Sequence, residues 1–212
     1  MDDDELRASV EVHLSECRYA LEALIDLHCA AGSVFGPERP GDDQAGAIWE
    51  LSGYALAQGR AYLSLLEGGF VPASAVQGRV MHEALVALVG VTVPGSDALS
   101  SYLADRGVKA ETARRDTQEL QRQAEEQIGT SGPDLRNLAL SIYKGLSGYA
   151  HNGRSAVREC ISEPPVSFAY GPHPSIYRVA SHVGLASLQF VHLAAVVRSG
   201  MGFSRRQQLA RE

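Results

Sequence analysis

The sequence predicts an all-α fold, a single-domain bundle of about six to eight helices in a chain of 212 residues. Apolar residues recur at steps of three and four over long segments, which is the period of an amphipathic helix. Turns that contain glycine and proline separate these segments. No stretch of useful length alternates apolar and polar residues as a half-buried strand does. We expect the bundle to cover residues 1–199 and a polar C-terminal tail to follow at 200–212.

Three long helical patterns occupy the first half of the chain. The first covers Asp4 to Ala31 and stops at Gly32, a residue type that often ends helices. The second runs from Asp43, an N-cap candidate, to Glu67, which two glycines follow. The third has Pro72 in its first turn, where proline is favoured, and continues to about Val91.

The second half contains patterns of different character. Residues 96–106 predict a short helix, and residues 134–151 and 175–199 predict longer ones. Residues 109–128 are dense in charge and have a thin apolar stripe, and opposite charges stand four apart. This pattern favours a solvated outer helix, and the alternative is a surface that binds a protein partner.

Composition limits the classes of function. The 19 basic and 25 acidic residues give a net charge of -6, which argues against a broadly basic nucleic-acid-binding surface and leaves a local basic cleft open. The Arg, Ala and Gly content suggests a GC-rich bacterial genome. The three cysteines form no C-x-x-C pair, which argues against a disulfide framework or a zinc knuckle. No phosphate-binding glycine loop, H-E-x-x-H, paired Glu-x-x-His or G-x-S-x-G motif occurs, so we expect no cofactor and no metal.

Location in the cell is predicted from two segments. The acidic start of the chain is the opposite of the positive region that opens a signal peptide. The longest uncharged stretch, Val179 to Val197, contains Ser, Gln and two His residues, which favour a buried helix in a bundle over a membrane span. We therefore expect a cytoplasmic protein with no membrane association.

An Arg–Glu pair is the first polar feature that needs an explanation. Residues 71–95 contain two formally charged side chains, Arg79 and Glu83, four apart on one helix face, with His82 beside them. The many apolar neighbours predict that the pair is buried, and burying two charges costs several kcal/mol for each. The pair is expected either to brace neighbouring helices or to line a cleft.

A second polar stripe precedes Asn152. Tyr143, Ser147 and His151 stand four apart on a predicted helix, beside an apolar stripe, and Arg154 follows the turn. The stripe predicts either a hydrogen-bond network between packed helices or one wall of a cleft shared with the Arg–Glu pair. His182, Gln189 and His192 also interrupt the last apolar helix, and we interpret the two histidines as residues of the core.

Two short patterns carry a resemblance. The first is R-x-x-x-E at Arg79 and Glu83, and the second is Y-x-x-L-S-x-x-A-H, which runs from Tyr143 to His151. Together they resemble a widespread bacterial all-helical family of unknown function, which is similar in outline to the HEPN superfamily. Many HEPN proteins dimerise and bind or cleave RNA in toxin–antitoxin and phage-defence systems. Their nuclease motif is an Arg, a polar residue and a His a few positions later. Here Arg136 and Asn137 begin such a motif, but the next His is His151.

Two functional hypotheses follow. In the first, the chain is a non-catalytic domain that binds a protein partner or a small ligand, and Arg79, Glu83, Tyr143 and His151 form a structural or ligand-orienting network. In the second, which the resemblance implies, a homodimer binds or cuts RNA. His151 would then act as the acid or base, Arg79 or Arg154 would hold phosphate, and Glu83 would be a further catalytic candidate.

Overall fold

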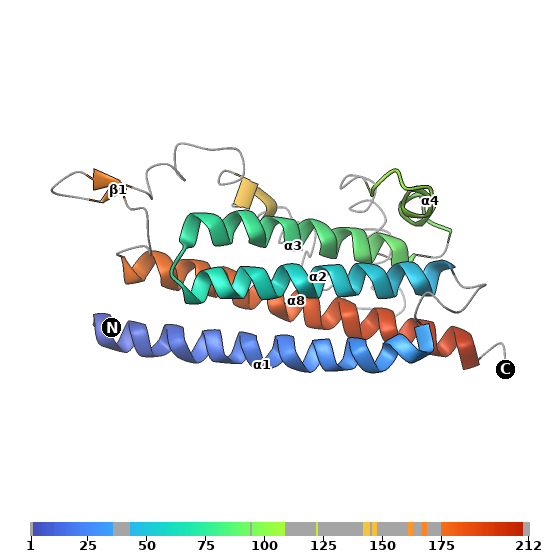
Figure 1. Ribbon diagram of the computed structural model, residues 1–212, viewed down its shortest axis with the longest axis horizontal. Helices are drawn as coiled ribbons and strands as arrows, with labels where there is room; N and C mark the ends of the chain where they lie inside the picture. The colour runs from blue at the N-terminus through green and yellow to red at the C-terminus, as the bar shows by residue number, and fades with distance from the viewer. Residues whose placement is uncertain are drawn as a thin grey trace.

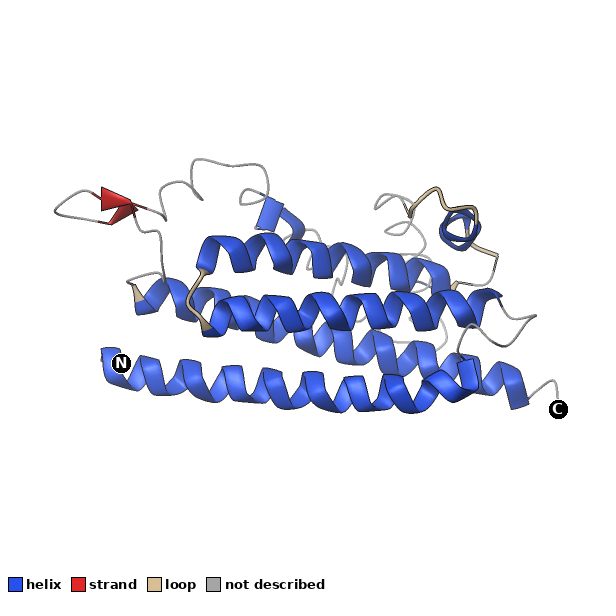
Figure 2. Ribbon diagram, in the orientation of Figure 1, coloured by secondary structure: helices blue, strands red, loops and turns tan. Residues whose placement is uncertain are grey.

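The structure, a computed structural model, describes residues 2–35, 43–93, 95–108, 122, 142–144, 146–147, 161–162, 167–168 and 175–209. Its helices are α1 (Asp3–Phe35), α2 (Asp43–Glu67), α3 (Val71–Thr92), α4 (Asp97–Leu103) and α8 (Ile176–Leu209). Figure 1 shows α1, α2, α3 and α8 lying along the long axis of the molecule. The all-α prediction is confirmed, as Figure 2 shows by colour, and the predicted helix number depends partly on residues outside the described part.

The core lies between the four long helices. Helices α2 and α8 each pack against the other three, so both have buried residues on more than one side. Buried side chains come from all four helices and include Leu21, Ile48, Leu56, Leu85, Leu88, Phe190 and Leu193. Each such side chain contributes about 1.5–3 kcal/mol when it leaves water. Apolar burial therefore fixes the arrangement of the helices that carry the polar residues discussed below.

Glycines allow α2, α3 and α8 to approach one another closely. A Cβ atom on Gly78 would lie 2.8 Å from Cζ of Tyr62, and one on Gly59 would lie 3.2 Å from Sδ of Met81. The buried Gln189 side chain of α8 donates a hydrogen bond to the carbonyl oxygen of Gly78 at 3.1 Å. Three helices thus meet around Gly78, and the amide of Gln189 compensates part of the cost of its own burial.

The predicted end of the first helix is wrong, because α1 continues through Gly32 to Phe35. Gly32 lies against the indole of Trp49, where a Cβ atom would be 3.3 Å from Nε1. The indole Nε1–H donates to the carbonyl oxygen of His28 at 3.4 Å, and the two rings stack with centroids 4.9 Å apart. Here glycine serves close packing of α2 on α1 and does not end the helix.

The other boundaries match the predictions to different degrees. Helix α2 has the predicted bounds, and Gly69 follows it with a φ of 72°. Helix α4 is shorter than predicted and begins after Ser96, whose hydroxyl accepts from the backbone N–H of Leu99 at 3.0 Å. Helix α8 continues to Leu209, into the segment expected as a tail, because Arg, Gln and Leu are good helix formers. An antiparallel pair of two-residue strands, β1 (Ile161–Ser162) and β2 (Ser167–Phe168), was not predicted.

The charged segment 109–128 and the apolar helix near the C-terminus were the subjects of two further predictions. Of the charged segment 109–128, the structure describes Arg122, which is helical, and the rest lies outside the described residues. In the described part of the chain, residues 176–197 of α8 form a helix long and apolar enough to cross a membrane, with a mean hydropathy of 1.5. Helices α3 and α4 meet the same criteria when they are joined across their 109° bend. Core helices of soluble proteins meet these criteria as well.

The hydroxyl of Tyr62 provides a first stability test. The side chain is fully buried, and its oxygen has no hydrogen-bond partner among the described residues. Desolvation raises the pKa of this phenol, so the group stays neutral. Because an unsatisfied buried hydroxyl costs about 1–3 kcal/mol, Tyr62→Phe should raise the free energy of unfolding by about 1 kcal/mol in a urea titration. A loss of stability in this variant would show that the hydroxyl has a partner.

His28 provides a pH test. Burial against Trp49 lowers the pKa of its imidazole, whose Nε2 would lie 2.9 Å from a Cβ atom on Gly53. A folded-state pKa below the unfolded value of about 6.5 means that the contribution is present above that pH and is lost as the pH falls through the folded pKa. Stability should therefore fall between about pH 7.5 and about pH 5.5, and less so in His28→Gln. Urea titrations at both values measure this, and an unchanged dependence in the variant would contradict the assignment.

Candidate functional site

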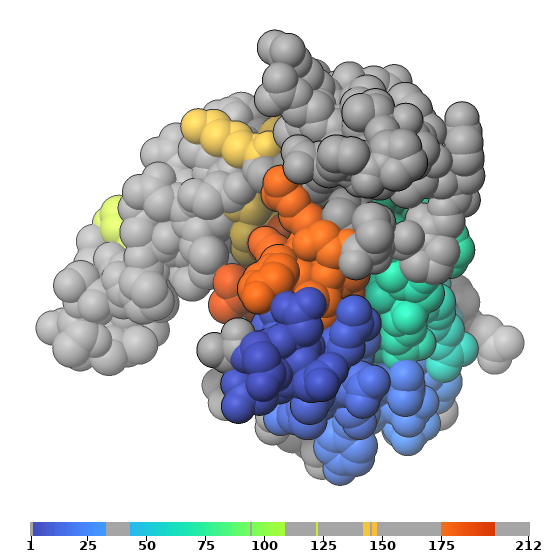
Figure 3. Space-filling view, turned by 90° about the vertical axis from the view of Figure 1, so that its left-hand side faces the viewer, coloured from blue at the N-terminus to red at the C-terminus, as the bar shows by residue number. Residues whose placement is uncertain are grey.

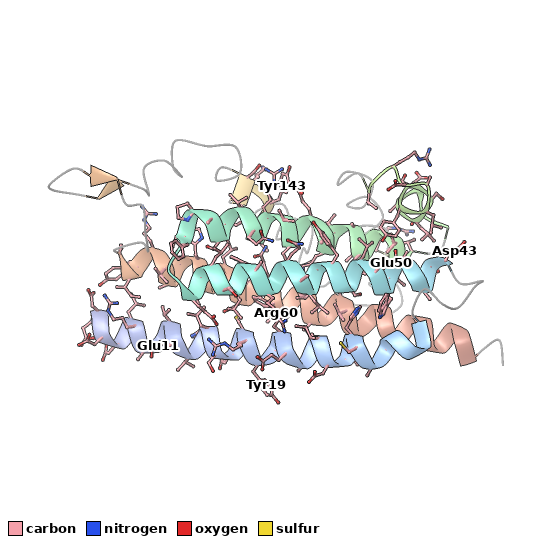
Figure 4. The ribbon with its side chains drawn as sticks, viewed as in Figure 1. Glu11, Tyr19, Asp43, Glu50, Arg60 and Tyr143 are labelled. Atoms are coloured by element: carbon pink, nitrogen blue, oxygen red, sulfur yellow. The ribbon has the colours of Figure 1, made fainter. Side chains whose placement is uncertain are left out.

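Arg79 connects α3 to residues far away in the sequence. Its Nε donates to Oε1 of Glu83 at 2.9 Å, within the same helix. Its Nη1 donates to the hydroxyl of Ser147 at 3.3 Å, and its Nη2 donates to the hydroxyl of Tyr143 at 3.2 Å. Figure 4 shows Tyr143 next to α3. The structure thus brings together four residues that the sequence placed in two separate stripes, and we call them the Arg79 network.

Helical geometry explains why the described residues of the segment 142–147, which are 142–144 and 146–147, can contact the bundle in two ways at once. Ile142 and Leu146, four apart, are buried and pack with Ala75 of α3 and Leu185 of α8. Tyr143 and Ser147, each one residue further along, lie on the adjacent face and contact Arg79. The Arg79 guanidinium carbon also lies 5.0 Å from the centre of the Tyr143 ring, within the range of a cation–π interaction. Both apolar and polar contacts therefore attach this segment to α3.

Exposure distinguishes the two charged members of the network. The Arg79 side chain is 14% exposed, whereas that of Glu83 is 45% exposed. The prediction that both charges are buried is thus wrong for Glu83, because its position on α3 faces solvent. An exposed pair of this kind contributes about 0–1 kcal/mol by itself. The hydroxyls of Tyr143 and Ser147 therefore matter for Arg79, since they replace water around the part of the guanidinium that is buried.

The remaining candidate residues lie on α3, on α8 or outside the described residues. His82 is buried on α3, and its ring centre lies 6.5 Å from that of Tyr143 at an interplanar angle of 42°. His182 of α8 is also buried, and burial lowers the pKa of His192 on the same helix. The structure does not describe His151 and Arg154. Any role for these two residues stays a prediction.

The formal charges of Arg79 and Glu83 cancel within the network, and hydrogen bonds connect its four members. A guanidinium has five N–H donors on three nitrogens, and here each nitrogen has an acceptor within the chain. The more exposed charged group is the carboxylate of Glu83 and not the cation. Among the described residues, no cluster of His, Cys, Asp and Glu side chains could hold a metal ion. The arrangement can position a segment and offer a carboxylate to a partner.

The structure also has a hollow of about 280 Å³ that the sequence patterns did not predict. It lies where α1, the α2–α3 turn and the start of α8 meet, at the end of the molecule that faces the viewer in Figure 3. Its lining includes Arg7, Glu11, Leu66, Glu67, Ile176 and Val179 and none of the predicted site residues. A sequence signal was the Gly68–Gly69 turn, but nothing local showed that the ends of α1 and α8 would meet there.

No protein-family model matches the chain, and neither a curated protein nor a solved structure matches it.

Proposed function

We propose that this protein is a non-catalytic helical-bundle domain that binds a partner protein or small ligand, in which the Arg79 network holds residues 142–147 on α3. The observation that supports this is the set of three hydrogen bonds in which each nitrogen of the Arg79 guanidinium has an acceptor within the chain. The proposal includes a cytoplasmic location, with which the free thiols of Cys17 and Cys29 are compatible.

The direction of the Arg79 donors argues against a phosphate-binding role. An arginine that recognises phosphate presents its planar fork to the ligand, often through two parallel hydrogen bonds. Here Nη1 and Nη2 point to the Ser147 and Tyr143 hydroxyls, and a ligand phosphate would have to displace them. The neighbouring carboxylate of Glu83 would also repel it. The exposed group therefore favours a partner that brings a cation or a hydrogen-bond donor.

The surface next to Glu83 has a mixed character. Val76, two turns before Glu83 on α3, is 40% exposed. An apolar side chain about 10 Å from a carboxylate along one helix face fits a partner that combines a basic group with apolar contact area. Val76 and Glu83 thus define the binding surface that we propose, and the Arg79 network supports it from behind.

Photo-crosslinking in the source cells tests this function. A crosslinking amino acid at position 76 should give a discrete adduct, which Glu83→Gln should weaken. The same amino acid at position 19, exposed on α1, is the matched control and should give no such adduct. Equal labelling from both positions would contradict the proposal.

An RNA assay tests the alternative function. Purified protein is incubated with labelled single-stranded RNA, alongside His151→Ala and Arg79→Gln. We expect no cleavage and no saturable binding by any of the three proteins. Cleavage by the unmodified chain that His151→Ala abolishes would overturn the proposal in favour of a HEPN-like ribonuclease.

A further inference from the structure

The outward face of α8 carries a regular, uncharged stripe. It comprises Tyr177, Ser181, Gly184, Leu188, Val191 and Ala195, all exposed, and we call it the α8 seam. Tyr177, Leu188 and Val191 are large side chains with 59%, 52% and 69% exposure. The opposite face of α8 is buried in the bundle core, and the one seam side chain with a polar contact to its own chain among those described is Tyr177, whose hydroxyl hydrogen-bonds to Asp3 at the start of α1. Figure 3 shows part of α8, in orange, at the surface beside α1.

The spacing of the α8 seam is that of a coiled-coil core. Successive members are four, three, four, three and four residues apart, which is the alternation of the two core positions in a heptad. Such a seam buries itself against another helix with the same spacing. Over residues 177–195 its length is about 27 Å at 1.5 Å per residue.

The order of large and small residues indicates which helix fits. We propose that the α8 seam pairs with the α8 seam of a second copy of this chain, antiparallel, about a two-fold axis near Ala186. In that arrangement Tyr177 faces Ala195, Ser181 faces Val191 and Gly184 faces Leu188, each in both directions, as a two-fold contact requires. Every pair matches a larger residue with a smaller one, which lets the two surfaces interdigitate. Each pair also joins the two different core positions of the heptad.

A parallel pair would lack this match. It would place Leu188 against Leu188 and Gly184 against Gly184, so the leucines would set a helix separation that leaves a gap between the glycines. No formally charged residue lies between Arg178 and Arg198, so self-pairing would bury no charge within the seam itself. The proposal does not use the Arg79 network, so either can fail without the other.

The size of the contact predicts a reversible dimer. One helix seam provides less area than the roughly 800 Å² per partner of a standard interface. The dimer should therefore dissociate on dilution, which sedimentation velocity over a range of concentrations measures. Leu188→Glu should raise the dissociation constant at least about tenfold, because each copy would bury a carboxylate against Gly184 of the other. Val12→Glu, on an exposed apolar position of α1, is the matched control and should not change it. A monomeric unmodified chain, or equal effects of both variants, would overturn the proposal.

Gly184 allows a sharper test that leaves the fold intact. A Cβ atom there would meet nothing within 4 Å in its own chain. Gly184→Leu should thus keep or raise the melting temperature, since leucine is the better helix former, while it weakens the dimer at least about tenfold by collision with Leu188 of the second copy. Unchanged association in this variant would contradict the pairing.

Cysteine crosslinking tests the direction of pairing. In a background with Cys29→Ser and Cys160→Ser, a mixture of Gly184→Cys and Leu188→Cys chains should form a mixed disulfide on oxidation faster than either chain alone. Faster crosslinking of Leu188→Cys alone would indicate a parallel pair. Flotation with vesicles of phosphatidylcholine and phosphatidylglycerol tests a lipid surface as the occupant, and binding that Leu188→Glu abolishes in a monomeric chain would overturn the proposal.

Discussion

Gly78→Ala should lower the free energy of unfolding by about 3 kcal/mol, the upper end of what overpacking of a core costs. The added Cβ would lie 2.8 Å from Cζ and 3.0 Å from Cε1 of the fully buried Tyr62 ring. An aromatic ring is rigid and cannot bend aside as the end of a flexible side chain can. Helix α3 must then move away from α2, which also strains the hydrogen bond from Gln189 to the Gly78 carbonyl.

Gly46→Ala is the matched control for this substitution. Gly46 also lies within a long helix, but a Cβ atom there would meet nothing within 4 Å. Alanine should therefore stabilise the chain by about 0.5–1 kcal/mol through its lower conformational entropy in the unfolded state. Urea titrations of both variants measure the contrast. If Gly78→Ala were as stable as the unmodified chain, the close approach of α2 and α3 would be wrong.

Arg79→Gln should lower the free energy of unfolding by about 2 kcal/mol, because it removes charge-assisted hydrogen bonds to two hydroxyls. Arg79→Lys should recover little of this loss, since an ammonium group lacks the planar fork that reaches Ser147 and Tyr143 together. Glu83→Gln should cost less than about 0.5 kcal/mol, because its carboxylate is 45% exposed.

Arg60→Gln is the matched control, since Arg60 is an exposed arginine within α2. It should change the free energy of unfolding by less than about 0.5 kcal/mol. Thermal and urea unfolding of the four variants measure these differences. If Arg79→Gln behaved like Arg60→Gln, the guanidinium would not hold residues 142–147 on α3.

The sequence was sufficient for features that depend on local periodicity. Steps of three and four located α2 and α3 to within one or two residues. The same period correctly placed Tyr143 and Ser147 on one helix face and Arg79 and Glu83 on another. Each stripe could therefore be recognised in the sequence as a polar interruption of an apolar pattern.

What could not be predicted depends on contacts between distant residues. Arg79 and Tyr143 are 64 positions apart, and no local pattern determines that their side chains meet. The exposure of Glu83 depends on which neighbours cover α3, and periodicity does not reveal this. Gly32 was assigned to a helix end because glycine often ends helices. Glycine also allows close packing, and only the position of Trp49 distinguishes the two uses.

A double-mutant cycle between Arg79 and Tyr143 tests the central claim most directly, namely that the Arg79 network holds residues 142–147 on the bundle. The cycle compares Arg79→Gln, Tyr143→Leu and the double variant by urea unfolding. We predict a coupling free energy of at least about 1 kcal/mol. Either single substitution already removes the hydrogen bond and the ring contact, so the second substitution has no further loss of these contacts to cause. Additive effects within about 0.3 kcal/mol would contradict the claim, since residues that do not interact show no coupling.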